Sequence, residues 1–202
     1  MRYTSKNADC PVWNVRCDRM WVITLAKGEN PFKLSEPINF TPGSENVPEF
    51  TTTKNGVEFR YDSLRQGEQT WDIGLTLQVR QAGDEFEFLA KIENGADGWC
   101  VQHLKFPILF EIRKDGGDHQ GLAALLPSFL GERLATPEKF GKQRRITYPS
   151  GRAAAMQYSI FDSGKAGLYL ACHDQKRSRK TFAFANRESG YDFSLENEPY
   201  CM

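Results

Sequence analysis

The sequence predicts an all-β protein: an antiparallel two-sheet sandwich with little helix. Apolar residues recur at every second position in several stretches, which places alternate side chains on opposite faces of a strand. Most of these stretches are bounded by Gly, Asp, Asn or Ser, which favour turns. The chain has 202 residues, enough for one sandwich, so we expect a single domain over 1–202.

The N-terminal quarter has the least regular pattern. We expect positions 1–10 to form a disordered tail. Segments 12–17 and 19–25 predict a pair of strands, each containing a tryptophan. Positions 27–50 contain four prolines and predict a long surface connection, because proline interrupts the hydrogen bonding of regular strands.

The middle of the chain has the strongest alternation. A strand is expected at 57–61. In 72–80 every second residue is apolar, and 85–93 repeats the pattern after a short turn that contains glycine, so the two segments predict a hairpin. The apolar residues that alternate in these two segments are Ile73, Leu75, Leu77, Val79, Phe86, Phe88, Ala90 and Ile92.

The segment 99–113 predicts an unusually long strand. Pro107 lies inside it, and proline lacks the N–H that a central strand position needs. We therefore expect an edge, a bulge or a bend at Pro107. The residues expected on one face are Leu104, Phe106, Ile108, Phe110 and Ile112.

The C-terminal part predicts four short strands, at 156–161, 167–172, 181–185 and 191–195. Only 121–134 differs, because its apolar residues follow helical spacing while Pro127 limits any helix to a turn or two. A series of short strands with little helix is typical of a two-layer sandwich.

Composition excludes several classes of function. Lys plus Arg and Asp plus Glu number 26 each, so no net charge attracts nucleic acid or anionic membranes. The chain has no apolar run long enough for a membrane span and no signal peptide. We expect a cytoplasmic protein from this chain, although a preceding segment could carry an export signal.

Cysteine and histidine spacing indicates no metal site and no cofactor. The five cysteines include no C-x-x-C pair, so we expect free thiols, with pairing of Cys10 and Cys17 left open. The three histidines lack the spacing that would place two ligands on one helix face. Nucleophile-elbow, P-loop and dinucleotide-binding motifs are also absent.

His173 and Trp99 are the strongest candidates for ligand contacts. His173 ends an apolar strand and is followed by Asp174, and strand ends often present polar side chains to a cleft. Trp99 follows a glycine-containing turn, where its ring could stack on a sugar. The basic residues predict solvated turn positions; they are Lys142, Arg144, Arg145, Lys176, Arg177, Arg179 and Lys180.

Several short segments together resemble one protein family. They include Tyr-Pro-Ser at 148–150, Met-Gln-Tyr at 156–158 and the block 162–174, which ends in Cys-His-Asp. Segments at 11–13, 103–107 and 126–128 extend the similarity over most of 11–195. The chain resembles the N-terminal supersandwich region of a family of bacterial proteins regarded as glycoside hydrolases, a region with a galactose mutarotase-like fold.

The resemblance implies a non-catalytic, carbohydrate-associated module. In that family a (β/α)-barrel with the catalytic carboxylates follows the sandwich, and this chain stops before any barrel. The module would support such a barrel, in cis or in trans, or line a sugar cleft, with His173, Asp174, Trp99 and His103 as ligand-binding residues and none catalytic.

Two other functions are left open. An aldose mutarotase would need a histidine facing a carboxylate as acid and base, here His103 or His173 with Glu111 or Glu132. A structural module would instead self-associate through exposed strand edges, and a homo-oligomer is left open on that ground.

Overall fold

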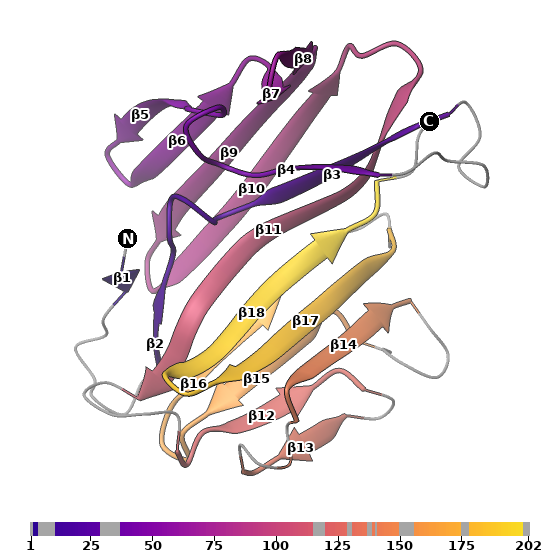
Figure 1. Ribbon diagram of the computed structural model, residues 1–202. Helices are drawn as coiled ribbons and strands as arrows, with labels where there is room; N and C mark the ends of the chain where they lie inside the picture. The colour runs from indigo at the N-terminus through magenta and orange to yellow at the C-terminus, as the bar shows by residue number, and fades with distance from the viewer. Residues whose placement is uncertain are drawn as a thin grey trace. The chain divides into compact units, whose positions relative to one another are not determined.

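The computed structural model describes residues 2–3, 11–28, 37–114, 120–128, 131–136, 139, 141–149, 156–174 and 178–199 (Figure 1). Within these described residues the eighteen elements with defined bounds are all β-strands, arranged in antiparallel sheets. The all-β sandwich class predicted from alternation is therefore confirmed. The described residues include no helix that is long and apolar enough to cross a membrane.

The chain divides into two compact units. The middle unit comprises Trp21–Pro107, and the terminal unit comprises Met1–Met20 together with Ile108–Glu198. The long strand β11 (Trp99–Lys114) belongs to the middle unit up to Pro107 and to the terminal unit from Ile108. The expectation of one domain over 1–202 stays a prediction.

The middle unit has two layers of strands. One layer is the sheet β10-β9-β6-β5, and the other joins β3 and β4 to the first part of β11, with β7–β8 as a separate hairpin. The strands are β3 (Val22–Lys27), β4 (Ile38–Phe40), β5 (Glu49–Thr53), β6 (Gly56–Tyr61), β7 (Leu64–Gln66), β8 (Gln69–Trp71), β9 (Ile73–Ala82) and β10 (Glu85–Asn94).

Aromatic side chains fill the space between these layers. Trp21 meets Tyr61 edge to face with ring centroids 5.1 Å apart, and Phe88 meets Phe106 at 5.9 Å. The predicted β9–β10 hairpin is present in full register. Burial follows its predicted period of two, because the inward residues of β9 are at most 3% exposed. They are Ile73, Leu75, Leu77 and Val79.

The two strands predicted at 12–17 and 19–25 are present as β2 (Pro11–Asn14) and β3, and each pairs with β11. Two other expectations for the N-terminal quarter need revision. Within 27–50, predicted as a surface connection, β4 pairs with β3, and Phe40 is only 1% exposed. In the predicted tail, Arg2–Tyr3 forms β1, and positions 4–10 lie outside the described residues.

The terminal unit is also a two-sheet sandwich. The order β1-β2-β11-β18-β17-β14 forms one sheet, and β13-β12-β15-β16 forms the other. The strands not yet bounded are β12 (Ala123–Leu126), β13 (Glu132–Leu134), β14 (Gln143–Tyr148), β15 (Tyr158–Asp162), β16 (Gly167–Ala171), β17 (Lys180–Arg187) and β18 (Gly190–Asn197).

Phe161 of β15 joins the two sheets of the terminal unit. Its ring lies 6.0 Å from that of Phe184 on β17 and 5.2 Å from that of Tyr191 on β18, and all three side chains are at most 2% exposed. The expected turn of helix in 121–134 is wrong. β12 and β13 occupy this segment, and Ala124 pairs with both Leu134 and Phe161.

The predicted single face of β11 does not persist along the strand. Leu104 and Phe106 are buried as expected, but Leu109 is 1% exposed, whereas Ile108 and Phe110 are half-buried. The register with β2 shifts between Phe110 and Arg113, and such a bulge changes which side chains face inward. An irregularity was expected near Pro107; the register shifts lie on either side of it.

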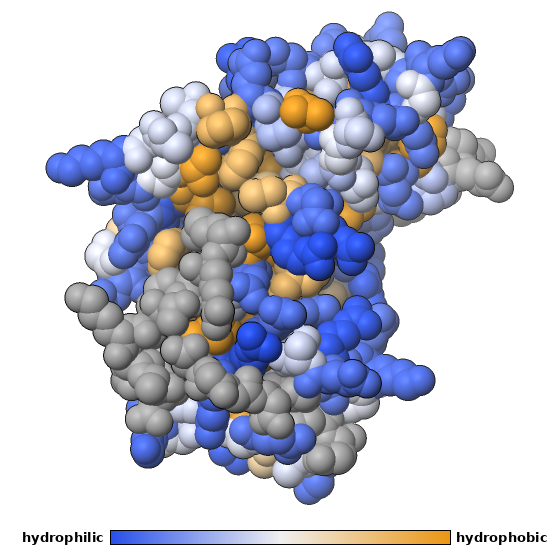
Figure 2. Space-filling model, turned by 60° about the vertical axis from the view of Figure 1, so that its left-hand side comes forward, coloured by the Kyte–Doolittle hydropathy of each residue, from blue (hydrophilic) through white to orange (hydrophobic). Residues whose placement is uncertain are grey.

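A few large apolar side chains remain at the surface of the described chain. Val47 is 72% exposed, Phe50 70%, Tyr169 55% and Leu89 41%. On the face shown in Figure 2, hydrophobic residues emerge in patches among hydrophilic ones. Scattered exposure of this kind is normal for folded proteins.

Candidate functional site

The end of β16 is held in place by a buried lysine. Lys180, the first residue of β17, is 0% exposed, and its Nζ donates to Asp174 Oδ2 and to Gln157 Oε1, each at 2.8 Å. The same ammonium lies 5.3 Å from the centroid of the Tyr148 ring. A buried charge is stable only where partners of this kind replace water.

Asp174 joins this lysine to the loop between β16 and β17. Its Oδ2 accepts a 2.7 Å hydrogen bond from the backbone N–H of Ser178 and another from the Ser178 hydroxyl. The Asp174 side chain is 22% exposed, so its carboxylate is partly hydrated. We call Tyr148, Gln157, Asp174, Ser178 and Lys180 the lysine anchor. Asp174, predicted as a ligand-binding residue, is one of its members.

The expectation of solvated turns is wrong for part of the basic residues. Lys180 is buried in the lysine anchor. Arg144 pairs with Glu132, and Arg145 pairs with Glu196, which raises the pKa of Arg145 because its guanidinium donates to that carboxylate. Lys176 and Arg177 lie outside the described residues.

Two tyrosines lie on the outer face of β15 and β16, in the same sheet as the anchored strand end. The register pairs Tyr158 with Ala171 and Ile160 with Tyr169, so both tyrosines share one face. Their ring centroids are 5.4 Å apart with a 39° tilt, and Tyr169 is 55% exposed. We call Tyr158 and Tyr169 the tyrosine face. Sequence reasoning did not identify it: period two from Phe161 places Tyr158 outward, but the outward direction of Tyr169 follows only from the pairing of Phe161 with Leu168.

His173 lies between the tyrosine-bearing strand and the lysine anchor. It is exposed, as expected for a polar residue at a strand end. Cys172 precedes it, and burial raises the pKa of this thiol, an effect that the nearby Lys180 ammonium partly offsets. The structure therefore presents the imidazole to solvent, while burial makes the adjacent thiol harder to ionise than a free thiol.

The two remaining predicted ligand residues belong to the middle unit. Trp99 is half-buried and meets Trp71 edge to face at 5.9 Å, so its ring packs in the unit rather than standing free at a rim. His103 is half-buried in β11, opposite Thr24 of β3. Trp99 and His103 thus lie in a different unit from His173 and Asp174.

The two glutamates considered as the carboxylate of a mutarotase contact other residues. Glu111 Oε2 accepts a 2.7 Å hydrogen bond from Asn14, and Glu132 pairs with Arg144. Among the described residues, no histidine side chain donates a hydrogen bond to either carboxylate. These contacts suit structural roles for both glutamates.

The described residues contain no group of three or more His, Cys, Asp or Glu side chains placed to hold a metal ion. The cysteines there are free thiols: Cys17 is exposed, whereas Cys100 and Cys172 are half-buried. Cys10, whose pairing with Cys17 was left open, lies outside the described residues, as does His119.

Comparison with known proteins returned no relative for this chain. No protein-family model, no curated protein and no solved structure matches it significantly.

Proposed function

We propose that this chain is a non-catalytic, carbohydrate-associated β-sandwich module, which contacts a saccharide through the tyrosine face and His173. Within this proposal it supports the catalytic barrel of a glycoside hydrolase, in cis or in trans, or lines its sugar cleft. The observation that supports it best is the exposed Tyr169 ring beside Tyr158, on a strand that ends two residues before the exposed His173.

The chemistry of this surface suits a pyranose. An exposed aromatic ring offers a flat apolar surface to the C–H face of a sugar, while a neighbouring polar group hydrogen-bonds a hydroxyl. Tyr169 supplies the ring and a phenolic hydroxyl, and His173 supplies an imidazole that both donates and accepts when neutral. The lysine anchor fixes the backbone next to His173, which lowers the entropic cost of ordering this strand end on binding.

A titration followed by ¹H–¹⁵N NMR tests the proposal. Soluble neutral oligosaccharides are added to the full chain, and we expect shifts at the amides of Tyr158, Tyr169 and His173. Tyr169→Ala should weaken binding by about two- to tenfold, the range for loss of one aromatic stacking contact. Phe50→Ala is the matched control, because Phe50 is an exposed aromatic of the other unit, 70% exposed against 55% for Tyr169.

Two results would refute the proposal. One is the absence of shifts at these amides across a broad oligosaccharide panel. The other is an equal loss of affinity in Tyr169→Ala and Phe50→Ala, which would indicate nonspecific aromatic contact. Well-dispersed spectra of both variants show that each has folded, so weakened binding is not a folding defect.

A further inference from the structure

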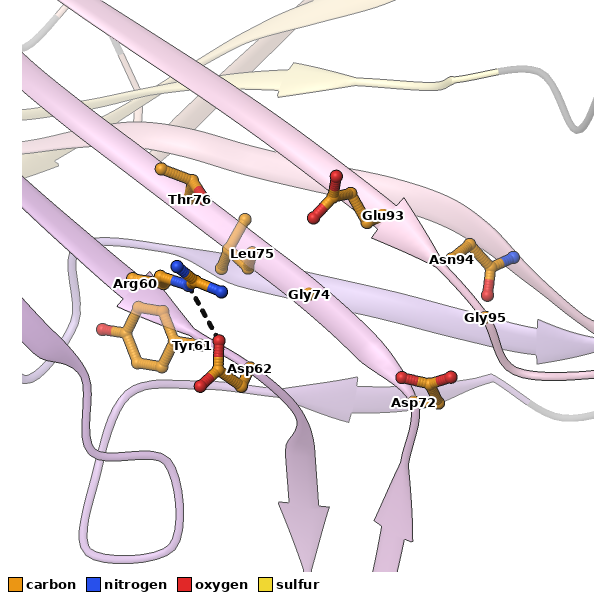
Figure 3. A pocket seen from close by; sticks show the side chains of 10 residues that line it. All are labelled: Arg60, Tyr61, Asp62, Asp72, Gly74, Leu75, Thr76, Glu93, Asn94 and Gly95. Carbon is orange, nitrogen blue, oxygen red and sulfur yellow. Dashed lines mark hydrogen bonds and ion pairs between the residues drawn. The ribbon is translucent and has the colours of Figure 1, made fainter.

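A polar hollow lies on the outer face of the middle unit's sheet β10-β9-β6-β5. Its volume is about 370 Å³, and strands β6, β9 and β10 line it. Figure 3 shows Arg60 and Asp62 to one side of Gly74, and Glu93 to the other. The lining residues are Arg60, Tyr61, Asp62, Asp72, Gly74, Leu75, Thr76, Glu93, Asn94 and Gly95.

Two glycines keep this hollow open. A Cβ at Gly74, the second residue of β9, would lie 3.4 Å from the side chain of Glu93, so any larger residue there would fill the space between Arg60 and Glu93. A Cβ at Gly95 would lie 2.2 Å from Asp72 Oδ2. The absence of both side chains leaves backbone as the floor and polar side chains as the walls.

The walls offer both donors and acceptors. Arg60 Nε donates to Asp62 Oδ1 at 2.8 Å, which leaves the other guanidinium nitrogens directed at solvent or a ligand, and Thr76 adds a hydroxyl. Glu93 Oε1 pairs with Lys91 at 2.7 Å, and Asp72 adds another carboxylate. A hydroxyl group donates and accepts at once, so a mixed set of this kind suits a polyhydroxylated ligand.

We infer that this hollow binds a small, uncharged, polyhydroxylated molecule through hydrogen bonds alone. Its volume is at the small end of the roughly 300–1,000 Å³ typical of small-molecule sites, which limits the ligand to the size of one sugar ring. The three carboxylates disfavour an anion, and because Arg60 and Lys91 already pair with two of them, little uncompensated negative charge remains to favour a cation. The inference does not rest on the tyrosine face, which belongs to the other unit.

Three probes of one size but different charge test it by ¹H–¹⁵N NMR: methyl α-glucopyranoside, glucuronate and glucosamine. We expect the neutral glycoside to shift the amides of Gly74, Thr76 and Glu93. Glucuronate should bind at least about fivefold more weakly, the effect of one unit-charge repulsion at water-like dielectric. Glucosamine should bind no more tightly than the neutral glycoside.

Gly74→Val should abolish these shifts by filling the hollow. The matched control is Gly43→Val in the same unit, because a Cβ at Gly43 meets nothing within 4 Å, and it should bind as the unchanged chain does. Thr76→Val is a second variant that removes one hydroxyl without adding bulk. The inference is overturned if the neutral glycoside leaves these amides unshifted, if glucosamine alone shifts them, or if a folded Gly74→Val still binds.

Discussion

The buried pair of Lys180 and Asp174 gives the sharpest test of the anchor that positions the candidate site. The two partners are not equivalent, because Lys180 is 0% exposed whereas the Asp174 side chain is 22% exposed. Removing one partner leaves the other charge without its counter-ion, so the loss of folding stability depends on which charge remains. We expect Asp174→Asn to destabilise the protein more than Lys180→Met.

The magnitudes follow from what each variant leaves. Asp174→Asn leaves a fully buried ammonium with only neutral acceptors, and breaking a buried pair in this way costs about 3–5 kcal/mol. Lys180→Met leaves a carboxylate that is partly hydrated and keeps both donors of Ser178, so we expect about 1–3 kcal/mol. The double variant should lose less stability than the two single variants together, because it leaves neither charge without a counter-ion.

Urea unfolding followed by far-ultraviolet circular dichroism measures these free energies. Lys91→Met is the matched control, since Lys91 forms an exposed ion pair with Glu93, with side chains 70% and 67% exposed, and such pairs contribute little. We expect no measurable change for it. The reasoning fails if Lys180→Met is at least as costly as Asp174→Asn, or if the two losses simply add.

Two further predictions concern Cys172 and Gly190. Because the pKa of Cys172 is raised, the folded thiol keeps its proton at pH values where the unfolded thiol ionises. The contribution of this thiol to the stability of the folded state is present below the ordinary thiol pKa and is lost as pH rises through the folded pKa. At about pH 8, near the ordinary thiol pKa, iodoacetamide should therefore label the exposed Cys17 first, and equal labelling in a peptide map would contradict this. Gly190 has a φ of 148°, and a Cβ there would lie 2.9 Å from the Glu111 carbonyl carbon. Gly190→Ala should therefore lower the free energy of unfolding, measured by thermal unfolding, by about 1–3 kcal/mol, whereas the control Gly43→Ala should not. A similar loss of stability in both variants would argue against strain at Gly190.

Alternation predicted the fold where each strand has one buried and one solvent-facing side. The β9–β10 hairpin is the clearest case, because a central strand with a polar outer face keeps a strict period of two. Prediction failed around β12, where Leu122, just before the strand, and Leu126, at its end, are both buried. Their four-residue spacing satisfies helix and strand alike, and only pairing with β15, which is distant in sequence, decides between them.

The candidate site was only partly predictable for a similar reason. A polar residue after an apolar strand indicated the exposed His173. Lys180 looked like one more cation in a basic turn, and its burial depends on Gln157 and Asp174, contacts that sequence spacing cannot reveal. The hollow at Gly74 was also missed, since a glycine in a strand gives no sign of which side chains will surround it.

We expect changes in the lysine anchor to affect how the strand end is positioned, and changes in the tyrosine face to affect direct contact with a ligand. Asp174 bonds to Lys180 and Ser178, so its effect on a saccharide would pass through the strand end that bears His173. Tyr169 has its ring at the surface, so its effect would be direct. Loss of Asp174 should therefore change stability more than affinity, and loss of Tyr169 the reverse, because an exposed ring contributes little to folding.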